Sequence, residues 1–186
     1  MKKDSIQNKF KWPFLLCLTL LWTCEKDDIC PETTQTTPLL VVEFNDFSDP
    51  EAVKFVPRMT LYAEDLVSEP PTGSTLATLV FDANTTEVNL PLQVNEDGIN
   101  STVRYVLERD TNLRLDDDAS TASNADVIQI QYTSTFEYVS RACGYKSNFT
   151  IINITIIADD DNWIEDVEVL ENSVTNQNTT HVRIFH

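Results

Sequence analysis

Hydrophobic residues recur along the chain in short stretches whose spacing predicts strands. The clearest alternation is Val88, Leu90, Leu92 and Val94, each separated from the next by one polar residue or proline. A period of two residues places alternate side chains on the same face of a strand. Nine such stretches are expected to be strands: 39–44, 59–63, 76–81, 88–94, 103–107, 127–139, 149–157, 167–170 and 182–185.

Two segments depart from simple alternation. Residues 149–157 carry apolar side chains on both phases, which predicts either a strand buried on both faces or a strand at a contact between chains. Residues 49–53 begin with Asp49 and Pro50, a cap residue followed by proline, and predict the one short helix. The connections are rich in Asn, Asp, Pro, Ser and Thr, which favour turns. We therefore expect an all-β fold, an antiparallel two-sheet β-sandwich of immunoglobulin-like type, over residues 38–186.

The N-terminus has the pattern of a secretory signal. Four lysines and one aspartate precede a short apolar run that ends at Trp22, too short to span a bilayer as a helix. Cys24 follows, at the position where a bacterial lipoprotein signal is cut and the new N-terminal cysteine receives its lipid. We predict a signal peptide over residues 1–23 and a lipidated Cys24, palmitate being an expected acyl group. An acidic, Thr-rich tether is expected over residues 24–37. The alternative is cleavage nearby by an ordinary signal peptidase, followed by an acidic linker.

The composition of the chain argues against nucleic-acid and nucleotide binding. The 186 residues include 13 Lys and Arg against 30 Asp and Glu, a formal charge of −17. A chain this acidic lacks the basic surface that neutralises phosphates, so no nucleic-acid partner is expected. The three glycines are too scattered to form a phosphate-binding loop. Removal of residues 1–23 would leave 163 residues with 9 basic and 29 acidic groups, a charge of −20.

The cysteines predict one covalent link. Cys17 lies in the leader and Cys24 is the lipidation candidate, which leaves Cys30 and Cys143 to form a disulfide outside the cytoplasm. A reactive thiol at Cys143, with its pKa lowered by Arg141 and Lys146, is the alternative. No serine-hydrolase or zinc-hydrolase motif surrounds His181 or His186, so no enzyme activity is expected.

Four blocks of the sequence can be compared with known families: Cys24–Cys30, Thr36–Phe44, Val139–Lys146 and His181–Phe185. Together they resemble a family of lipoproteins in Bacteroidetes-type bacteria, domain-of-unknown-function family 6452. The resemblance runs from Cys24 to the C-terminus. It implies a membrane-anchored all-β envelope protein and transfers no catalytic residue, because the family has no assigned activity.

Two further features suggest ligand chemistry. Asp116 and Asp118 in one loop, and Asp159 and Asp161 in another, are weak candidate ligands for a structural calcium ion, and solvated turns are the default explanation for them. No other cofactor is expected. Trp163, beside the second acidic turn, either stacks on a sugar or belongs to the core.

These observations converge on a lipid-anchored outer-membrane protein, facing the periplasm or exposed at the cell surface. Its expected role is that of a non-enzymatic binding or structural module of the envelope. The alternative is an accessory protein that binds or processes surface glycans. Its partners would be the membrane, through Cys24, and an envelope protein or glycan.

Overall fold

The computed structural model describes residues 29–34, 36–116, 118 and 120–186. Contacts divide the chain into two compact units. One combines the described part of Met1–Thr34 with Val139–Gly144, and the other contains Gln35–Tyr138 and Tyr145–His186. Cys24 and the predicted signal peptide lie outside the described residues. Of the predicted lipoprotein features, only part of the tether can therefore be compared with the structure.

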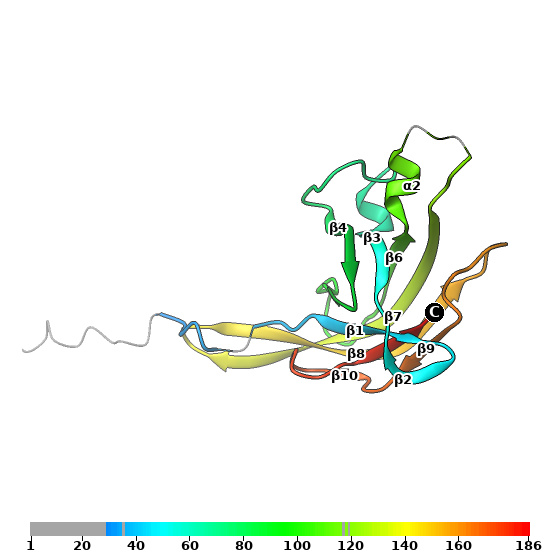
Figure 1. Ribbon diagram of the computed structural model, residues 1–186. Coiled ribbons are helices and arrows are strands. Elements are labelled where there is room, and N and C mark those ends of the chain that lie inside the picture. The colour runs from blue at the N-terminus through cyan, green and yellow to red at the C-terminus, as the bar shows by residue number, and fades with distance from the viewer. Residues whose placement is uncertain (1–28, 35, 117, 119) are drawn as a thin grey trace, which may run out of the picture. The chain divides into compact units, whose positions relative to one another are not determined.

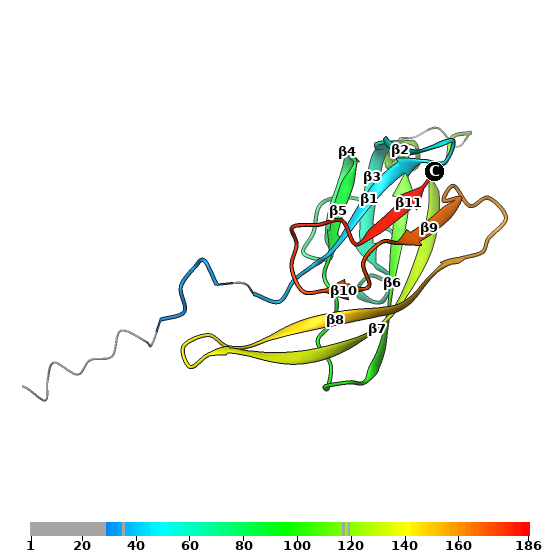
Figure 2. The same cartoon turned by 90° about the horizontal axis from the view of Figure 1, so that it is seen from below.

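The larger unit is a sandwich of two sheets. Figures 1 and 2 show its strands from two directions. In the first sheet the strands are ordered β2 (Asp49–Val53), β1 (Leu40–Asp46), β11 (Val182–Phe185) and β9 (Asp166–Val169), with β5 (Glu87–Leu90) also paired to β1. The second sheet has the order β10 (Ser173–Val174), β8 (Gly144–Ile157), β7 (Asn124–Ser140), β6 (Asn100–Arg109), β3 (Val56–Ala63) and β4 (Thr78–Thr85). The predicted all-β sandwich is confirmed.

Side chains from both sheets meet in one core. Phe44 and Ile184 of the first sheet and Leu61, Leu107 and Ile130 of the second are fully buried in the same cluster. Alternate residues of each strand point into this layer, which is why the period of two is visible in the sequence. At β5, Val88 and Leu90 are buried as expected, whereas Val94, beyond the end of the strand, is exposed.

The first sheet contains a parallel pair. Strand β1 lies beside β11, with Val42 opposite Val182 and Phe44 opposite Ile184. The other strand registers in both sheets are antiparallel wherever they are defined, for example β1 with β5 and β6 with β7. A strand near the start of the sandwich and the strand at its end are therefore direct neighbours.

The helix predicted for residues 49–53 is wrong. These residues form β2, an exposed strand paired with β1 at Asn45↔Val53 and Asp46↔Asp49. The Asn45 side chain donates a hydrogen bond to the Pro50 carbonyl at 3.0 Å, which helps to hold the strand in place. Because β2 lies at the edge of the sheet, Pro50 is tolerated there despite its missing N–H.

The expectation of burial on both faces of residues 149–157 is also wrong, because the buried face changes along β8. Phe149 and Ile151 are buried, whereas Ile152 on the opposite face is 52% exposed. Farther along the strand, Ile154 and Ile156 on that opposite face are partly buried against the core, while the residues between them and after them are exposed. The second sequence-based explanation, a contact between chains, stays a prediction.

A short helix, α2 (Thr111–Leu115), and a 3-10 turn, η2 (Glu64–Leu66), complete the sandwich. The helix is fixed by an ion pair. The Glu108 carboxylate is 2% exposed and accepts hydrogen bonds from Arg114 Nε at 2.5 Å and Nη2 at 2.8 Å. Arg114 Nη2 also donates to the Pro71 carbonyl at 2.8 Å. A charge in the interior of the sandwich thereby ties β6 to α2 and to the loop before β4.

Two further buried polar groups join distant segments. Asp126 on β7 is fully buried and accepts hydrogen bonds from the backbone N–H groups of Trp163 and Ile164, at 2.9 and 2.8 Å. His181 is also fully buried, and its Nδ1 accepts a bond from Val41 N–H at 3.1 Å. The His181 N–H in turn donates to the Val41 carbonyl at 3.0 Å. This reciprocal pair extends the contact between β1 and β11.

Candidate functional site

The best-formed apolar site is a pocket of about 440 Å³ at one end of the second sheet, which we call the leucine pocket. Its rim carries Leu66 of η2, Leu76 of the following loop and Leu79 of β4. Its inner wall includes Leu92 and Tyr105. A volume in this range is typical of small-molecule sites in proteins.

Two buried tyrosines fix the inner wall of the leucine pocket. The Tyr105 hydroxyl donates a hydrogen bond to the Pro91 carbonyl, and the Tyr132 hydroxyl donates one to the Gln93 carbonyl at 2.9 Å. Burial raises the pKa of both phenols, so they stay protonated and remain donors at neutral pH. Leu92, between the two anchored carbonyls, is 6% exposed. This side of the pocket is therefore set by the fold before any ligand arrives.

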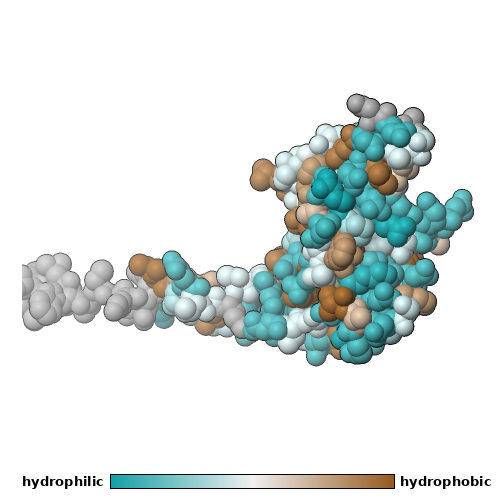
Figure 3. All heavy atoms as spheres, viewed as in Figure 1, coloured by the Kyte–Doolittle hydropathy of each residue, from teal (hydrophilic) through white to brown (hydrophobic). Residues whose placement is uncertain are grey.

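The rim of the leucine pocket is apolar and open to water. Leu66 is 69% exposed, Leu79 is 40% exposed and Leu76 is fully exposed. On the face seen in Figure 3, hydrophobic residues are interspersed among hydrophilic ones. Single exposed apolar side chains are ordinary, but three around the mouth of an apolar hollow can be covered together by one ligand.

Few polar groups line the leucine pocket. Gln93 and Thr102 contribute an amide and a hydroxyl, and Asp65 supplies the one carboxylate among its described lining residues. Just beside it, Glu64 forms an ion pair with Arg104 at 3.5 Å. The charge at the mouth is thus negative, which favours neutral or cationic apolar molecules over anionic ones.

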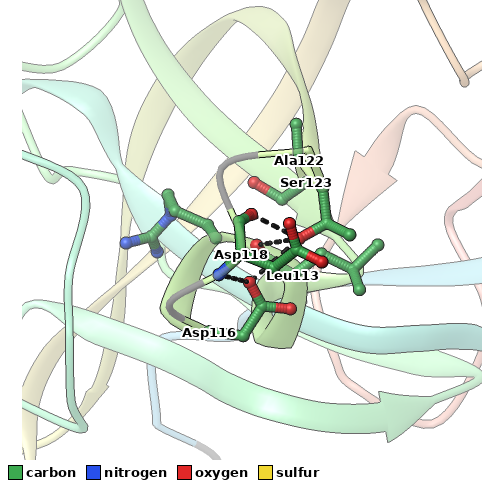
Figure 4. Close-up of a pocket in the computed structure, with 7 residues that line it drawn as sticks. Leu113, Asp116, Asp118, Ala122 and Ser123 are labelled. Atoms are coloured by element: carbon green, nitrogen blue, oxygen red, sulfur yellow. Dashed lines mark hydrogen bonds between the residues drawn. The ribbon is translucent and has the colours of Figure 1, made fainter.

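A second hollow, of about 500 Å³, lies at the predicted calcium loop around α2 (Figure 4). Asp116 Oδ1 accepts hydrogen bonds from Asp118 N–H at 3.0 Å and from the Thr121 hydroxyl at 2.9 Å. Asp118 Oδ1 accepts from the backbone and hydroxyl of Ser120, and these bonds lower the pKa of Asp118. These carboxylates stabilise the turns of their own loop.

The second acidic loop behaves in the same way. Asp159 Oδ1 accepts a hydrogen bond from Asp161 N–H at 3.1 Å, and Asn124 on β7 donates to the Asp161 carbonyl at 2.6 Å. In the described part of the chain, no three His, Cys, Asp or Glu side chains come together as a metal site. Calcium binding by these loops stays a prediction.

The sugar-stacking alternative for Trp163 is corrected by its burial. The indole is 4% exposed, and its Nε1 donates a hydrogen bond to the Leu107 carbonyl at 3.1 Å. His186 contacts the ring edge-on, with the centroids 5.4 Å apart, and the Arg109 guanidinium lies 5.9 Å from the ring centroid. A ring that is closed in by these neighbours offers no face to a ligand, so Trp163 belongs to the core.

The smaller unit contains the predicted cysteine pair. Cys30 and Cys143 lie at disulfide distance, with 2.04 Å between their sulfurs and 4.7 Å between their Cα atoms. The bond joins the tether to the turn between β7 and β8, and it leaves Cys143 without the free thiol that the alternative required. Cys24, the predicted lipidation site, lies outside the described residues.

Sequence reasoning missed the leucine pocket. Its lining residues come from η2, the loop before β4, the segment after β5 and strand β6, so no local motif contains them. Leu66 was the available signal, because it stands apart from every predicted strand. It was uninformative without knowledge of what lies beside it in space.

The fold and the pocket define the class: an all-β, two-sheet sandwich protein with a preformed apolar hollow. The model of the family of unknown function DUF6452 matches residues 67–186, so the chain belongs to that family. The matched region includes β4 through β11 and most of the lining of the leucine pocket. No curated protein and no solved structure matches the chain. Over the described residues, no helix is long and apolar enough to cross a membrane.

Proposed function

We propose that the protein is a lipoprotein of the bacterial outer membrane, of the Bacteroidetes type, anchored through acylated Cys24. Its sandwich acts as a non-enzymatic binding module. The basic and then apolar leader, followed by Cys24 and acidic residues, supports the anchor. The Cys30–Cys143 pair supports a location outside the reducing cytoplasm. The sandwich would face the periplasm, or the cell surface if the lipidated protein is also transported across the outer membrane.

The leucine pocket carries the proposed binding role. Its inner wall is fixed by the tyrosine hydroxyls, while Leu66, Leu76 and Leu79 leave apolar surface at its mouth in contact with water. A ligand that covers these side chains gains the free energy of their burial without the cost of shaping the site. The function that fits is recognition of a neutral or cationic apolar group, presented by a small molecule or by an envelope partner.

A neutral apolar dye, N-phenyl-1-naphthylamine, tests the pocket by fluorescence titration of the chain from Cys24. Ala77 lines the pocket from the turn just before β4, whereas Ala83 is exposed within β4, outside the lining. Ala77→Phe is expected to fill the hollow and weaken binding about tenfold, equivalent to about 1.4 kcal/mol. Ala83→Phe makes the same replacement and is expected to leave the affinity unchanged.

Equal affinities of the two variants and the parent chain would show that the dye binds elsewhere. Failure of the parent to bind would contradict a preformed apolar site. Circular dichroism of both variants distinguishes loss of the pocket from loss of the fold.

The anchor is tested by intact-mass analysis of protein taken from native membranes. An N-terminal peptide that begins at Cys24 and carries acyl mass is the expected result. An unmodified Cys24, or cleavage at another residue, would overturn the lipoprotein assignment.

A further inference from the structure

The end of the β7–β8 hairpin continues beyond the rest of its sheet. The register between β6 and β7 ends at Asn100↔Thr133, and β10 pairs with β8 at Phe149 and Thr150. Residues 134–138 and 145–148 therefore form a ribbon in which β7 and β8 have lost these partners (Figure 2). The ribbon is exposed along β7, where residues 135–138 all face water.

The ribbon has one aromatic face and one polar face. Phe136 and Tyr138 share a face because they alternate along β7, and the Tyr145 ring packs edge-on against Tyr138 at 5.4 Å. We call Phe136, Tyr138 and Tyr145 the aromatic face; they are 47%, 57% and 69% exposed. None of these three residues belongs to the described hydrophobic core or to the partly buried residues packed against it.

The opposite face of the ribbon is held by polar contacts. Glu137 accepts a hydrogen bond from Asn148 Nδ2 at 2.6 Å and forms an ion pair with Lys146 at 3.2 Å. These bonds lower the pKa of Glu137, so the pair stays charged near neutral pH. A water-facing polar side opposite an apolar side is the arrangement of an element that lies on an interface between water and lipid.

Covalent connections keep the ribbon near the predicted anchor. Tyr145 follows Cys143 by two residues, Cys143 is bonded to Cys30, and Cys30 follows Cys24 by six. At about 3.6 Å per extended residue, this path spans at most about 35 Å. The path from Cys24 through the tether to Leu40 contains sixteen residues and can extend to about 58 Å. The disulfide thus gives the ribbon a shorter covalent path to Cys24 than β1 has.

Charge also singles out this ribbon. Residues 134–148 contain Arg141 and Lys146 against the acid Glu137, in a chain whose formal charge is −17. Asp97, which accepts a hydrogen bond from the Phe136 N–H at 3.0 Å, brings one more acid to the ribbon, so its charges balance. An acidic protein body is repelled by anionic lipid headgroups, whereas a segment with balanced charges and tyrosines is not. Tyrosine is the side chain that prefers the headgroup region, because its ring is apolar and its hydroxyl is polar.

We propose that the aromatic face docks on the surface of the bilayer beside the lipid anchor. This inference rests on the proposed lipidation of Cys24. It adds a second membrane contact, which orients the chain on the membrane in addition to retaining it there. The occupant of the aromatic face is the headgroup region of the bilayer, including its anionic lipids.

Depth-dependent fluorescence quenching tests the proposal. The chain from Cys24, with Cys30 and Cys143 oxidised, is coupled through the Cys24 thiol to maleimide phospholipid. The vesicles contain phosphatidylcholine with brominated acyl chains and a minority of phosphatidylglycerol. Tyr145→Trp supplies the reporter, and the one native tryptophan of this chain, Trp163, is buried in the core. Phe47→Trp places a matched reporter on the turn between β1 and β2, at a residue that is 55% exposed.

The expected result is strong quenching of the reporter in the Tyr145→Trp chain and little quenching in the Phe47→Trp chain. Adding Phe136→Ser and Tyr138→Ser to the Tyr145→Trp chain should at least halve the quenching. Replacing both Cys30 and Cys143 by serine should reduce it as well, because the ribbon is then released from the anchor. Circular dichroism confirms that each variant is folded.

Equal quenching of the two reporters, or none in the Tyr145→Trp chain with coupling complete, would overturn the proposal. Such an outcome would favour a glycan or a protein partner, in place of the bilayer, as the occupant of the aromatic face. Because the lipid is attached chemically, this result does not depend on native acylation. Lipidation of Cys24 is tested separately by the intact-mass analysis, so failure of the proposed anchor and failure of the proposed docking can be told apart.

Discussion

His181 makes the stability of the sandwich sensitive to acid. Burial lowers the pKa of His181 below its usual 6.5, so the native state holds the ring neutral. Protonation would place a hydrogen on Nδ1, which already accepts the Val41 N–H. The neutral His181 ring therefore contributes its full stabilisation above pH 6.5. This stabilisation is lost as the pH falls from 6.5 towards the lower pKa of the folded state. Burial lowers the pKa of His186 too, in the same direction.

We expect the free energy of unfolding to fall from about pH 7.5 to about pH 5.5, as measured by urea denaturation. His181→Asn removes the titration at this position and should make the fall smaller, even if the variant is less stable at the upper end of this range; the part that remains is expected from His186. Burial raises the pKa of Asp126, and its titration acts in the opposite direction, so it can reduce the expected fall but cannot produce it. A parent profile without slope would contradict the prediction.

The Glu108–Arg114 pair should contribute far more to stability than the pairs at the surface. Arg114→Ala leaves the Glu108 carboxylate buried without its cation, and we expect a loss of about 3 kcal/mol in the free energy of unfolding. Arg104→Ala breaks the pair with Glu64, whose side chains are 47% and 41% exposed, and should cost less than about 1 kcal/mol. Equal losses in urea titrations would refute the distinction.

At the scale of residues, the sequence predicts burial well only where side chains are apolar. Val88 and Leu90 were correctly placed in the core by their alternation. Glu108 was not identified, because a carboxylate in a strand normally faces water. It is buried here because Arg114 of α2 supplies a matching charge and the Ser123 hydroxyl donates a further hydrogen bond. That pairing depends on tertiary structure and has no local signature.

Among the elements, the disulfide offers the sharpest prediction. Cys30 and Cys143 are 113 residues apart, so their bond restricts the unfolded chain over a long loop. In the chain-entropy model, replacing both by serine lowers the free energy of unfolding by about 4–5 kcal/mol, as an upper figure. Urea denaturation of the double variant, beside the parent chain with and without reductant, measures this loss. A loss below about 1 kcal/mol would show that the unfolded chain is restricted by other means.

The sequence predicted the long strands better than the short segment that begins with Asp49 and Pro50. The apolar stretches at 39–44, 127–139 and 182–185 correspond to β1, β7 and β11 within a few residues. Asp49 and Pro50 are typical of a helix start, yet the segment forms β2 because β1 lies beside it and supplies backbone partners. Pairing between segments outweighs a local preference when the partner is already ordered. The leucine pocket was missed because it too depends on which segments become neighbours.

For the whole molecule, the negative charge should make stability depend on salt. The formal charge of −17, or −20 without residues 1–23, makes the compact state repel itself. Raising NaCl from about 0.01 to about 0.1 M shortens the screening length from about 30 to about 10 Å. We expect the melting temperature to rise by about 2–4 °C, the change that about 1 kcal/mol produces in a chain of this size.

Calcium chloride at matched ionic strength provides the control for this measurement. The same rise with either salt would assign the effect to screening. An additional rise with calcium would contradict screening as the whole explanation and would point to a site at the loops of Asp116 and Asp118 or of Asp159 and Asp161.

The parallel pairing of β1 with β11 has a consequence for biosynthesis. Residues 182–185, which complete the pairing of residues 40–46, are synthesised much later than those residues. Until they have been made, β1 lacks a partner along one edge and the first sheet cannot close. If the protein is exported as we propose, a machinery that threads unfolded chains would meet it before this sheet has formed. The sheet would then close on the far side of the membrane, where Cys30 and Cys143 can be oxidised as well.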